Sequence, residues 1–228
     1  MSRGFSDLAY AGFDAIFRPW MSRRIAGVSV VGLPEDVEPD RPLVLVANHV
    51  SWWDGFLLMQ IRRSIRPRAP FHTVMLQSEL QRSRFLRRIG AIGIEPSSPG
   101  SVIHAVRELS ERTRSRPDSV IFFFPQGRIW PSHRRPLGFK RGIEVFTNAI
   151  GSSTLLPVGI HFEPLTKASP QAFVSVGDPI PSEDKPSARD LEHAVEAQLD
   201  ELLGLIERHG EDVLNHHPFA VNGPHGSH

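Results

Sequence analysis

The pattern of apolar and polar positions predicts short buried strands that alternate with amphipathic helices. Short uninterrupted apolar runs are typical of strands buried on both faces, and the clearest lie at 43–47 and, after one serine, at 119–124. Less extensive runs of the same kind predict further strands at 27–31, 73–76, 91–94, 154–162 and 172–176.

Apolar residues at spacings of three and four predict helices between these strands. Ser78 and Ser101 are expected to cap two of them, and Ser187 with Asp190 predicts a capping box for the last. A long loop is expected between the strand that ends at 124 and the next helix. The predicted helices span 54–64, 78–89, 101–116, 140–150 and 187–208. The last is expected to bury Leu191, Val195, Leu199, Leu202 and Ile206.

This alternation predicts an α/β fold with a single domain, in which helices flank a largely parallel central sheet. A chain of 228 residues is long enough for one such domain. The organisation that we expect is an amphipathic helical segment at 1–26, the folded domain at 27–214 and a disordered tail at 215–228.

The N-terminal segment carries an apolar stripe at helical spacing, flanked by arginines. The stripe is either a surface that lies in a lipid interface or a face packed on the domain itself. Trp52 and Trp53 have the same two interpretations, since they can line an acyl channel or interface or contact this first helix. No run approaches the length of a membrane span, and Asp7, Asp14 and Arg18 interrupt any signal peptide core. The stripe comprises Phe5, Leu8, Ala9, Gly12, Phe13, Ile16, Phe17 and Trp20.

Charge is distributed unevenly although the net charge is only +1. Residues 60–90 contain eight arginines and one glutamate, whereas 160–212 contain twelve acidic and four basic residues. One side of the molecule is therefore expected to be positive. This surface either faces an anionic membrane or a phosphate-bearing ligand, or it belongs to ordinary arginine-rich helices exposed to solvent. The chain has no cysteine, so a thiolate nucleophile is excluded. Nucleic-acid binding is not expected, because the arginines are not interleaved with aromatic residues.

A histidine and an aspartate follow the buried strand 43–47, at the point where the next helix begins. Ligands of α/β proteins bind at the carboxyl ends of strands, so chemistry is expected here. Five steps along a helix rotate by about 140°, so His49 and Asp54 meet only if a turn precedes the helix. The carboxylate would then orient the imidazole, whose other nitrogen accepts a proton from a hydroxyl. From these residues alone, a hydrogen-bonded core pair is the alternative.

Four segments in order resemble the glycerolipid acyltransferases, the family of lysophospholipid and 1-acylglycerol-3-phosphate acyltransferases. They are N-H-V-S-W-W-D at 48–54, F-P-Q-G at 124–127, F-K-R-G at 139–142 and L-P-V-G-I at 156–160. The resemblance covers residues 40–180 and implies a glycerol-3-phosphate acyltransferase-like fold.

The resemblance implies transfer of a fatty acyl group from acyl-CoA or acyl carrier protein to a lipid hydroxyl, with His49 as the base and Asp54 as its partner. It implies no cofactor and no metal, and a cytoplasmic protein held peripherally at the inner face of the cell membrane. The substrate-binding residues carried over from the family blocks are Asn48, Ser51, Phe124, Pro125, Gln126, Gly127, Arg128 and Lys140.

The chain departs from the family at positions that are associated there with the glycerol-phosphate acceptor. Gln126 stands where the family has glutamate, Arg128 is shifted by one place, and the segment 93–96 lacks the usual arginine. The acceptor is therefore either a lysophospholipid or a lipid without phosphate, such as a glycolipid. The following loop, with Trp130, His133, Arg134 and Arg135, is either an acceptor contact or an ordinary polar loop.

Two other functions stay open on the sequence. One is a catalytically idle peripheral membrane protein that keeps the fold for lipid binding. The other is a thioesterase, which would release free fatty acid without any acceptor.

Overall fold

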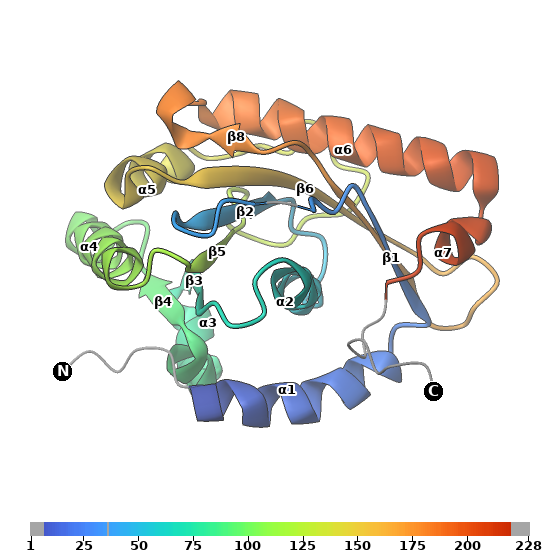
Figure 1. Ribbon diagram of the computed structural model, residues 1–228, viewed down its shortest axis with the longest axis horizontal. Coiled ribbons are helices and arrows are strands. Elements are labelled where there is room, and N and C mark those ends of the chain that lie inside the picture. Colours follow the sequence, from blue (N-terminus) through green and yellow to red (C-terminus); the bar gives the residue numbers. More distant parts are fainter. Residues whose placement is uncertain (1–6, 36, 220–228) are drawn as a thin grey trace.

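A mixed eight-stranded sheet forms the centre of the molecule (Figure 1). In this computed structural model, residues 7–35 and 37–219 are described. The strand order is β1-β7-β6-β2-β5-β3-β4, with β8 paired to β6. β6 is antiparallel to β7 and β8, and every other pairing is parallel. The strands are β1 (Gly27–Val31), β2 (Leu43–Ala47), β3 (Phe71–Leu76), β4 (Ala91–Ile94), β5 (Val120–Phe123), β6 (Thr154–Glu163), β7 (Gln171–Val176) and β8 (Ile180–Pro181).

Helices cover both faces of the sheet, which confirms the predicted α/β class. α1 (Asp7–Ser22) and α2 (Asp54–Ile65) lie on one side, and α4 (Pro99–Ser115), α5 (Gly142–Ile150) and α6 (Ala188–His209) on the other (Figure 1). The sequence of β2 is apolar throughout because alternate residues of a strand point to opposite faces and both faces of β2 are buried. Leu43, Leu45 and Ala47 join the core under α2, while the two valines between them join the core under α4, α5 and α6.

The helix predicted at 78–89 is two shorter helices. α3 (Gln77–Arg82) ends at Ser83, and the 3-10 helix η1 (Arg84–Ile89) follows. Leu80 and Ile89 are both buried. Nine residues apart on an α-helix, they would point in opposite directions, so the break lets both reach the core. Ser78 makes no cap, because α3 begins one residue earlier with no side-chain cap.

The cap of α4 is also shifted from its predicted position. Ser98 is the N-cap and accepts from the backbone N–H of Ser101, with Pro99 in the first turn. The Ser101 hydroxyl instead accepts from the N–H of Glu95 at 2.9 Å. The predicted capping box of α6 is confirmed at Ser187 and Asp190.

The predicted disordered tail is wrong for residues 215–219. α7 (Asp212–His216) packs Val213 into the interior, and the segment after it pairs with the edge strand β1. Val30 donates to the carbonyl of His217, and Phe219 donates to that of Val28. This segment satisfies backbone groups that an edge strand otherwise exposes. The rest of the predicted tail, 220–228, lies outside the described residues.

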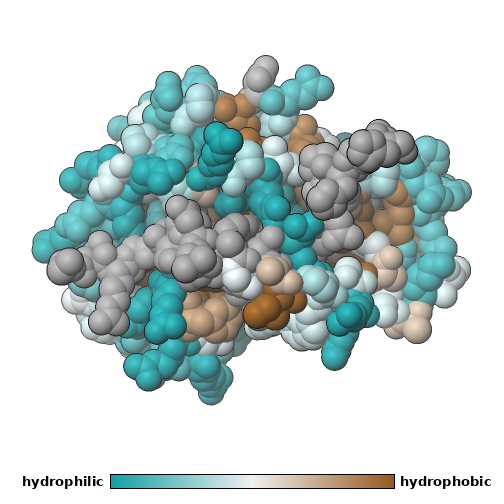
Figure 2. Space-filling view, turned by 60° about the horizontal axis from the view of Figure 1, so that its bottom comes forward, coloured by the Kyte–Doolittle hydropathy of each residue, from teal (hydrophilic) through white to brown (hydrophobic). Residues whose placement is uncertain are grey.

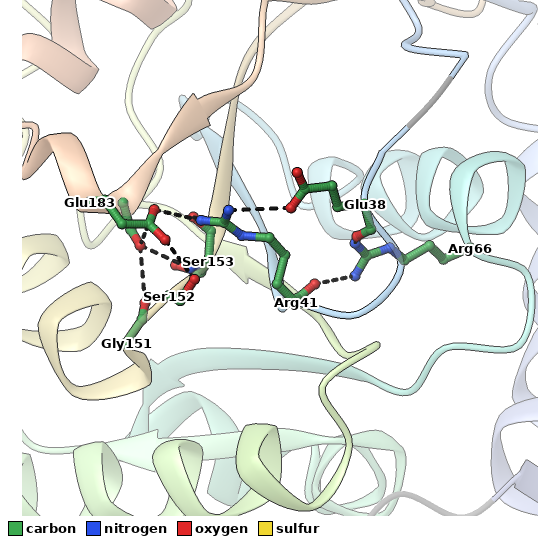
Figure 3. A network of polar contacts seen from close by, with 8 residues as sticks. Glu38, Arg41, Arg66, Gly151, Ser152, Ser153 and Glu183 are labelled. Carbon is green, nitrogen blue, oxygen red and sulfur yellow. Dashed lines mark hydrogen bonds and ion pairs between the residues drawn. The ribbon is translucent and has the colours of Figure 1, made fainter.

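Arg41 and Arg66 form a clamp of hydrogen bonds that joins several loops near the amino-terminal end of β2 (Figure 3). Arg66 donates to the carbonyls of Arg41 and Asp118. Arg41 reaches the carbonyl of Ser153 at 2.9 Å and the carboxylate of Glu183 at 2.5 Å. The bond from Ser152 and the charge of Arg41 help to lower the pKa of Glu183 to about 2.

This clamp corrects the predicted positive face of residues 60–90. Arg62 and Arg66 are buried and donate to backbone carbonyls, so they serve the fold. The exposed arginines of α3 and η1 are Arg82, Arg84, Arg87 and Arg88, and Arg68 is exposed in the turn before β3.

Part of the N-terminal stripe packs on the domain, and another part of it is exposed. Phe17 stacks on Phe56 of α2 at 5.2 Å between ring centroids, and Met21 is buried. Ile16, the residue before Phe17, is 70% exposed. Phe5 and the side chains of Leu8, Ala9 and Phe13 lie outside the described part of the structure. In the part of the chain that the structure describes, no helix has the length and apolar content needed to cross a bilayer.

Candidate active site

The carboxyl end of β2 opens into a turn that is tied to the neighbouring strand β6. Asn48 is buried, donates through Nδ2 to the carbonyl of Ile160 at 2.9 Å, and accepts from the N–H of Ile160 at 2.7 Å. Its amide thus extends the β2–β6 pairing by one position beyond Ala47. The next residue, His49, is thereby fixed at the mouth of the sheet.

His49 and Asp54 meet across the turn that precedes α2, as the sequence requires. The imidazole Nδ1 lies 2.7 Å from Oδ2 of Asp54. The same oxygen accepts from the backbone N–H groups of Val50 at 2.7 Å and Ser51 at 2.9 Å. Among the described residues none bonds to Nε2 of His49, and the side chain is 23% exposed. One ring nitrogen is therefore held and the other is open to solvent or ligand.

Asp54 is completely buried at the first turn of α2. Burial raises the pKa of its carboxyl, and the hydrogen bonds from His49, Ser51 and Val50 oppose that effect. The positive end of the helix dipole also favours the carboxylate. A desolvated carboxylate gains most when its partner becomes a cation, so the pair is suited to an imidazole that accepts a proton.

The end of β5 supplies the second wall of the site. The ring of Phe124 stacks on the imidazole of His49, with 4.4 Å between centroids. Gln126 accepts from the N–H of His49 at 2.6 Å and donates to the carbonyl of Leu137 at 3.0 Å. A single buried amide therefore links the histidine to both ends of the loop between β5 and α5.

Gly127 and Lys140 lie against each other in this loop. Lys140 donates its backbone N–H to the carbonyl of Pro125 at 3.1 Å. A Cβ at residue 127 would stand 3.0 Å from the Lys140 ammonium nitrogen, and the backbone there has φ +71°. The positive φ favours glycine here, whereas the flexible end of the Lys140 side chain could move away from a Cβ. The side chains of Arg128 and Lys140 are exposed beside this turn.

Three predicted substrate-binding residues bond to backbone groups of the site. Asn48 and Gln126 are buried, and both polar ends of each amide bond to backbone groups, so they position the turn and the loop. Ser51 accepts from the N–H of Trp53 at 3.1 Å and shapes the same turn. The structure otherwise brings Phe124, Pro125, Gly127, Arg128 and Lys140 together around the loop, as the block order led us to expect.

Sequence reasoning missed how the long loop is held. The N–H of Trp130 donates to the carbonyl of His49 at 2.9 Å. Glu192 of α6 accepts from the N–H groups of Gly138 at 2.8 Å and Phe139 at 2.9 Å, and Glu196 accepts from Leu137 at 3.1 Å. Two glutamates one turn apart beside a buried helical stripe are the only signal for this contact in the sequence.

The described residues contain no group of three or more histidine, aspartate or glutamate side chains that is arranged to hold a metal ion. The site as it stands is a histidine–aspartate pair, a stacked phenylalanine and a basic loop.

Comparisons with known proteins identify the family and the fold. A family model described as Acyltransferase matches residues 28–161, which include the turn 48–54 and the loop 124–142. The crystal structure of the 1-acyl-sn-glycerophosphate (LPA) acyltransferase PlsC from Thermotoga maritima is similar in fold, with a TM-score of 0.57 at 18% sequence identity. The likeness covers 86% of this chain and 88% of that one. No curated protein matches the sequence.

Proposed function

The chain belongs to the acyltransferase family, and on that premise we propose that it transfers a fatty acyl group from a thioester donor to a lipid hydroxyl, with His49 as general base. The observation that carries the proposal is the 2.7 Å contact between Nδ1 of His49 and Oδ2 of Asp54, with no bond from any described residue to Nε2. The donor is acyl-CoA or acyl carrier protein, and no cofactor is required.

The reaction follows from the protonation states that this contact favours. Nδ1 carries a hydrogen and donates it to Asp54, which leaves the lone pair of Nε2 to accept the proton of the acceptor hydroxyl. The hydroxyl oxygen forms a bond to the thioester carbonyl carbon. The carbon–sulfur bond then breaks, and the leaving thiolate takes the proton from the imidazolium. Phe124, stacked on the ring, keeps the imidazole in one orientation throughout.

Labelled acyl-CoA and a total lipid extract test the proposal directly. With the purified protein, one class of lipid is expected to gain label. His49→Ala is expected to reduce the rate by about 10²- to 10⁴-fold, since it removes the base. Asp54→Asn should also reduce it strongly, because the imidazole loses its charged partner. His104→Ala is the matched control, because His104 is an exposed histidine of α4.

The outcomes separate the three candidate functions. Transfer that persists in His49→Ala contradicts the proposed base. Release of free fatty acid at the same rate with and without lipid indicates a thioesterase. Binding of lipid by the wild type without any transfer of label indicates a catalytically idle peripheral membrane protein.

The same proposal includes a membrane surface. Ile16 of α1, Trp52 before α2 and Phe85 of η1 are 70%, 53% and 40% exposed. Trp52 and Phe85 both contact the ring of Phe17, the residue that follows Ile16. Figure 2, with the α1 side turned forward, shows apolar surface between hydrophilic side chains on this face. Exposed arginines of η1 flank Phe85, which suits anionic head groups. A peripheral position at the inner face of the cell membrane would bring lipid close to His49, three residues before Trp52.

A further inference from the structure

Both backbone polar groups of His49 bond to the loop between β5 and α5. Its N–H donates to Oε1 of Gln126 at 2.6 Å, and its carbonyl accepts from the N–H of Trp130 at 2.9 Å. The residue that carries the proposed base is therefore attached to this loop at two points of its backbone. A shift of the loop by about 1 Å would shift the imidazole as well, and misplacement on that scale slows catalysis strongly.

The side chain of Gln126 also closes the loop. Its Nε2 donates to the carbonyl of Leu137 at 3.0 Å, and the residue is only 2% exposed, so water has little access to either bond. Within the loop, Arg128 and Arg134 stack on the ring of Trp130, with their guanidinium carbons 3.7 Å and 3.4 Å from its centroid. The loop is therefore ordered inside, and its two ends meet at Gln126.

The two partners of Gln126 require opposite hydrogen-bonding groups. The N–H of His49 needs an acceptor and the carbonyl of Leu137 needs a donor, and a glutamine amide supplies one of each. A glutamate carboxylate has nearly the same size but only acceptors, so it would keep the bond to His49 and turn its second oxygen towards the carbonyl oxygen of Leu137. Glutamine replaces the family's glutamate in this chain, so the bond to Leu137 is a property of this sequence.

We propose that Gln126 is a positioning residue of the acyl transfer, whose neutral amide locks the loop 124–137 onto the backbone of His49. The side chain does not contact the substrate in this role. It acts through His49, by holding the imidazole where Nε2 meets the acceptor hydroxyl. The inference rests on the proposed function, which gives the position of the base its importance. It requires that loss of the donor at residue 126 slow turnover and that return of the donor restore it.

Gln126→Glu tests this requirement, because protonation of the introduced carboxyl returns the donor. Burial raises the pKa of such a carboxyl above its ordinary value, so the donor is absent at pH 8 and returns as the pH falls through that raised pKa. We expect kcat at pH 8 to be about tenfold lower than in the wild type, as the loss of one buried hydrogen bond implies, with a smaller change in KM. The ratio of the two kcat values should rise towards one at lower pH. Protonation of His49, which both proteins share, cancels in this ratio.

Two further variants complete the comparison. Gln126→Met has a similar length without any polar group, so it should lose more activity than Gln126→Glu and show no recovery at low pH. Asn148→Asp makes the same change of amide to carboxyl at an exposed position of α5, and its kcat ratio should stay near one at every pH. A ratio for Gln126→Glu that does not change with pH, or that matches Asn148→Asp, overturns the proposal.

Hydrogen exchange keeps the test independent of turnover. In the wild type, the backbone amides of His49 and Trp130 are expected to show the same protection, because one opening of the loop exposes both. In Gln126→Glu, both should be about tenfold less protected at pH 8 than at pH 5, after correction for the intrinsic rates. Clearly different protection of the two amides in the wild type overturns the lock. Equal protection in a protein that transfers no acyl group supports the lock and contradicts only the proposed function.

Discussion

His72 is a buried histidine on β3, away from the candidate active site. Its Nδ1 lies 3.5 Å from Nη1 of Arg112, and its Nε2 lies 3.4 Å from the hydroxyl of Ser119. Burial, together with the charge of Arg112, lowers the pKa of the imidazole to about 4 from an ordinary value of 6.5. Nδ1 can only accept from the guanidinium, so the neutral ring donates through Nε2 to Ser119.

The free energy of unfolding is expected to fall as the pH falls from 6.5 to 4, because the unfolded chain binds a proton at this histidine and the folded one does not. Below pH 4 both states are protonated and this contribution becomes constant. The difference in pKa corresponds to about 3 kcal/mol. Urea unfolding at pH 7, 5.5 and 4 measures it.

His72→Gln keeps a polar side chain without the titration, so the pH dependence of its stability should be shallower by that amount. Equal slopes in the two proteins would show that His72 does not cause the effect.

At the scale of single residues, the sequence predicted the His49–Asp54 pair but not the backbone partners of Asn48 and Gln126. The pair was predictable because both residues lie in one short turn. The roles of Asn48 and Gln126 were not, since their partners are Ile160 and Leu137, which no local pattern connects to them. Whether an amide faces substrate or backbone depends on residues that only the fold brings close.

Among the elements, α6 has a second task besides covering the sheet. Its buried stripe packs Leu191, Val195 and Leu199 on the core, while Glu192 and Glu196 on the adjoining face hold the end of the long loop. The two oxygens of Glu192 accept from two consecutive N–H groups, which a carboxylate does well and an amide cannot.

Glu192→Gln is expected to lower the free energy of unfolding by about 1 to 2 kcal/mol, because one of the two N–H groups of residues 138 and 139 loses its acceptor. The rate of acyl transfer should fall as well, since the same loop carries Gln126 and Trp130. Glu201→Gln, an exposed glutamate of the same helix, serves as the control. Chemical denaturation and a transfer assay on both variants provide the comparison, and matching values for the two would contradict the role of Glu192.

Strands were predicted more accurately than the elements around them. The apolar runs at 43–47 and 119–124 correspond to β2 and β5 within one residue at each end, because burial on both faces permits little besides apolar side chains. The two-residue strand β8 contains a proline and was not predicted. The break between α3 and η1 and the pairing of 217–219 with β1 both depend on tertiary contacts, which periodicity does not report.

On the scale of the whole molecule, charge divides along the direction that separates α1 from α6. Exposed arginines gather on α3 and η1, while α6 is rich in glutamate and aspartate. α6 lies on the opposite side of the sheet from α1 (Figure 1). An anionic bilayer would therefore attract the α1 side and repel the α6 side, which orients the molecule before any apolar contact forms.

The double variant Ile16→Glu with Phe85→Glu is expected to bind vesicles of anionic phosphatidylglycerol about tenfold more weakly than the wild type, because two exposed apolar side chains are lost. Ile103→Glu, at an exposed position of α4 on the other face of the sheet, is the control. Cosedimentation with vesicles of phosphatidylglycerol and of phosphatidylcholine, at low and high salt, measures the affinity. Equal sedimentation of all three proteins would rule out this surface as the docking face.

The hydrogen bond from Gln126 to the carbonyl of Leu137 closes a loop whose sequence can vary more in evolution than that of the sheet. The chain outside this loop forms the sheet and holds the His49–Asp54 pair, so a change of sequence there disturbs the fold. The segment between its two ends is a closed loop on the surface, whose residues other than Gly127 can be exchanged without loosening the strands. A lineage could thus acquire a new substrate by rewriting one short stretch of chain, while the chemistry that it inherited stays in place.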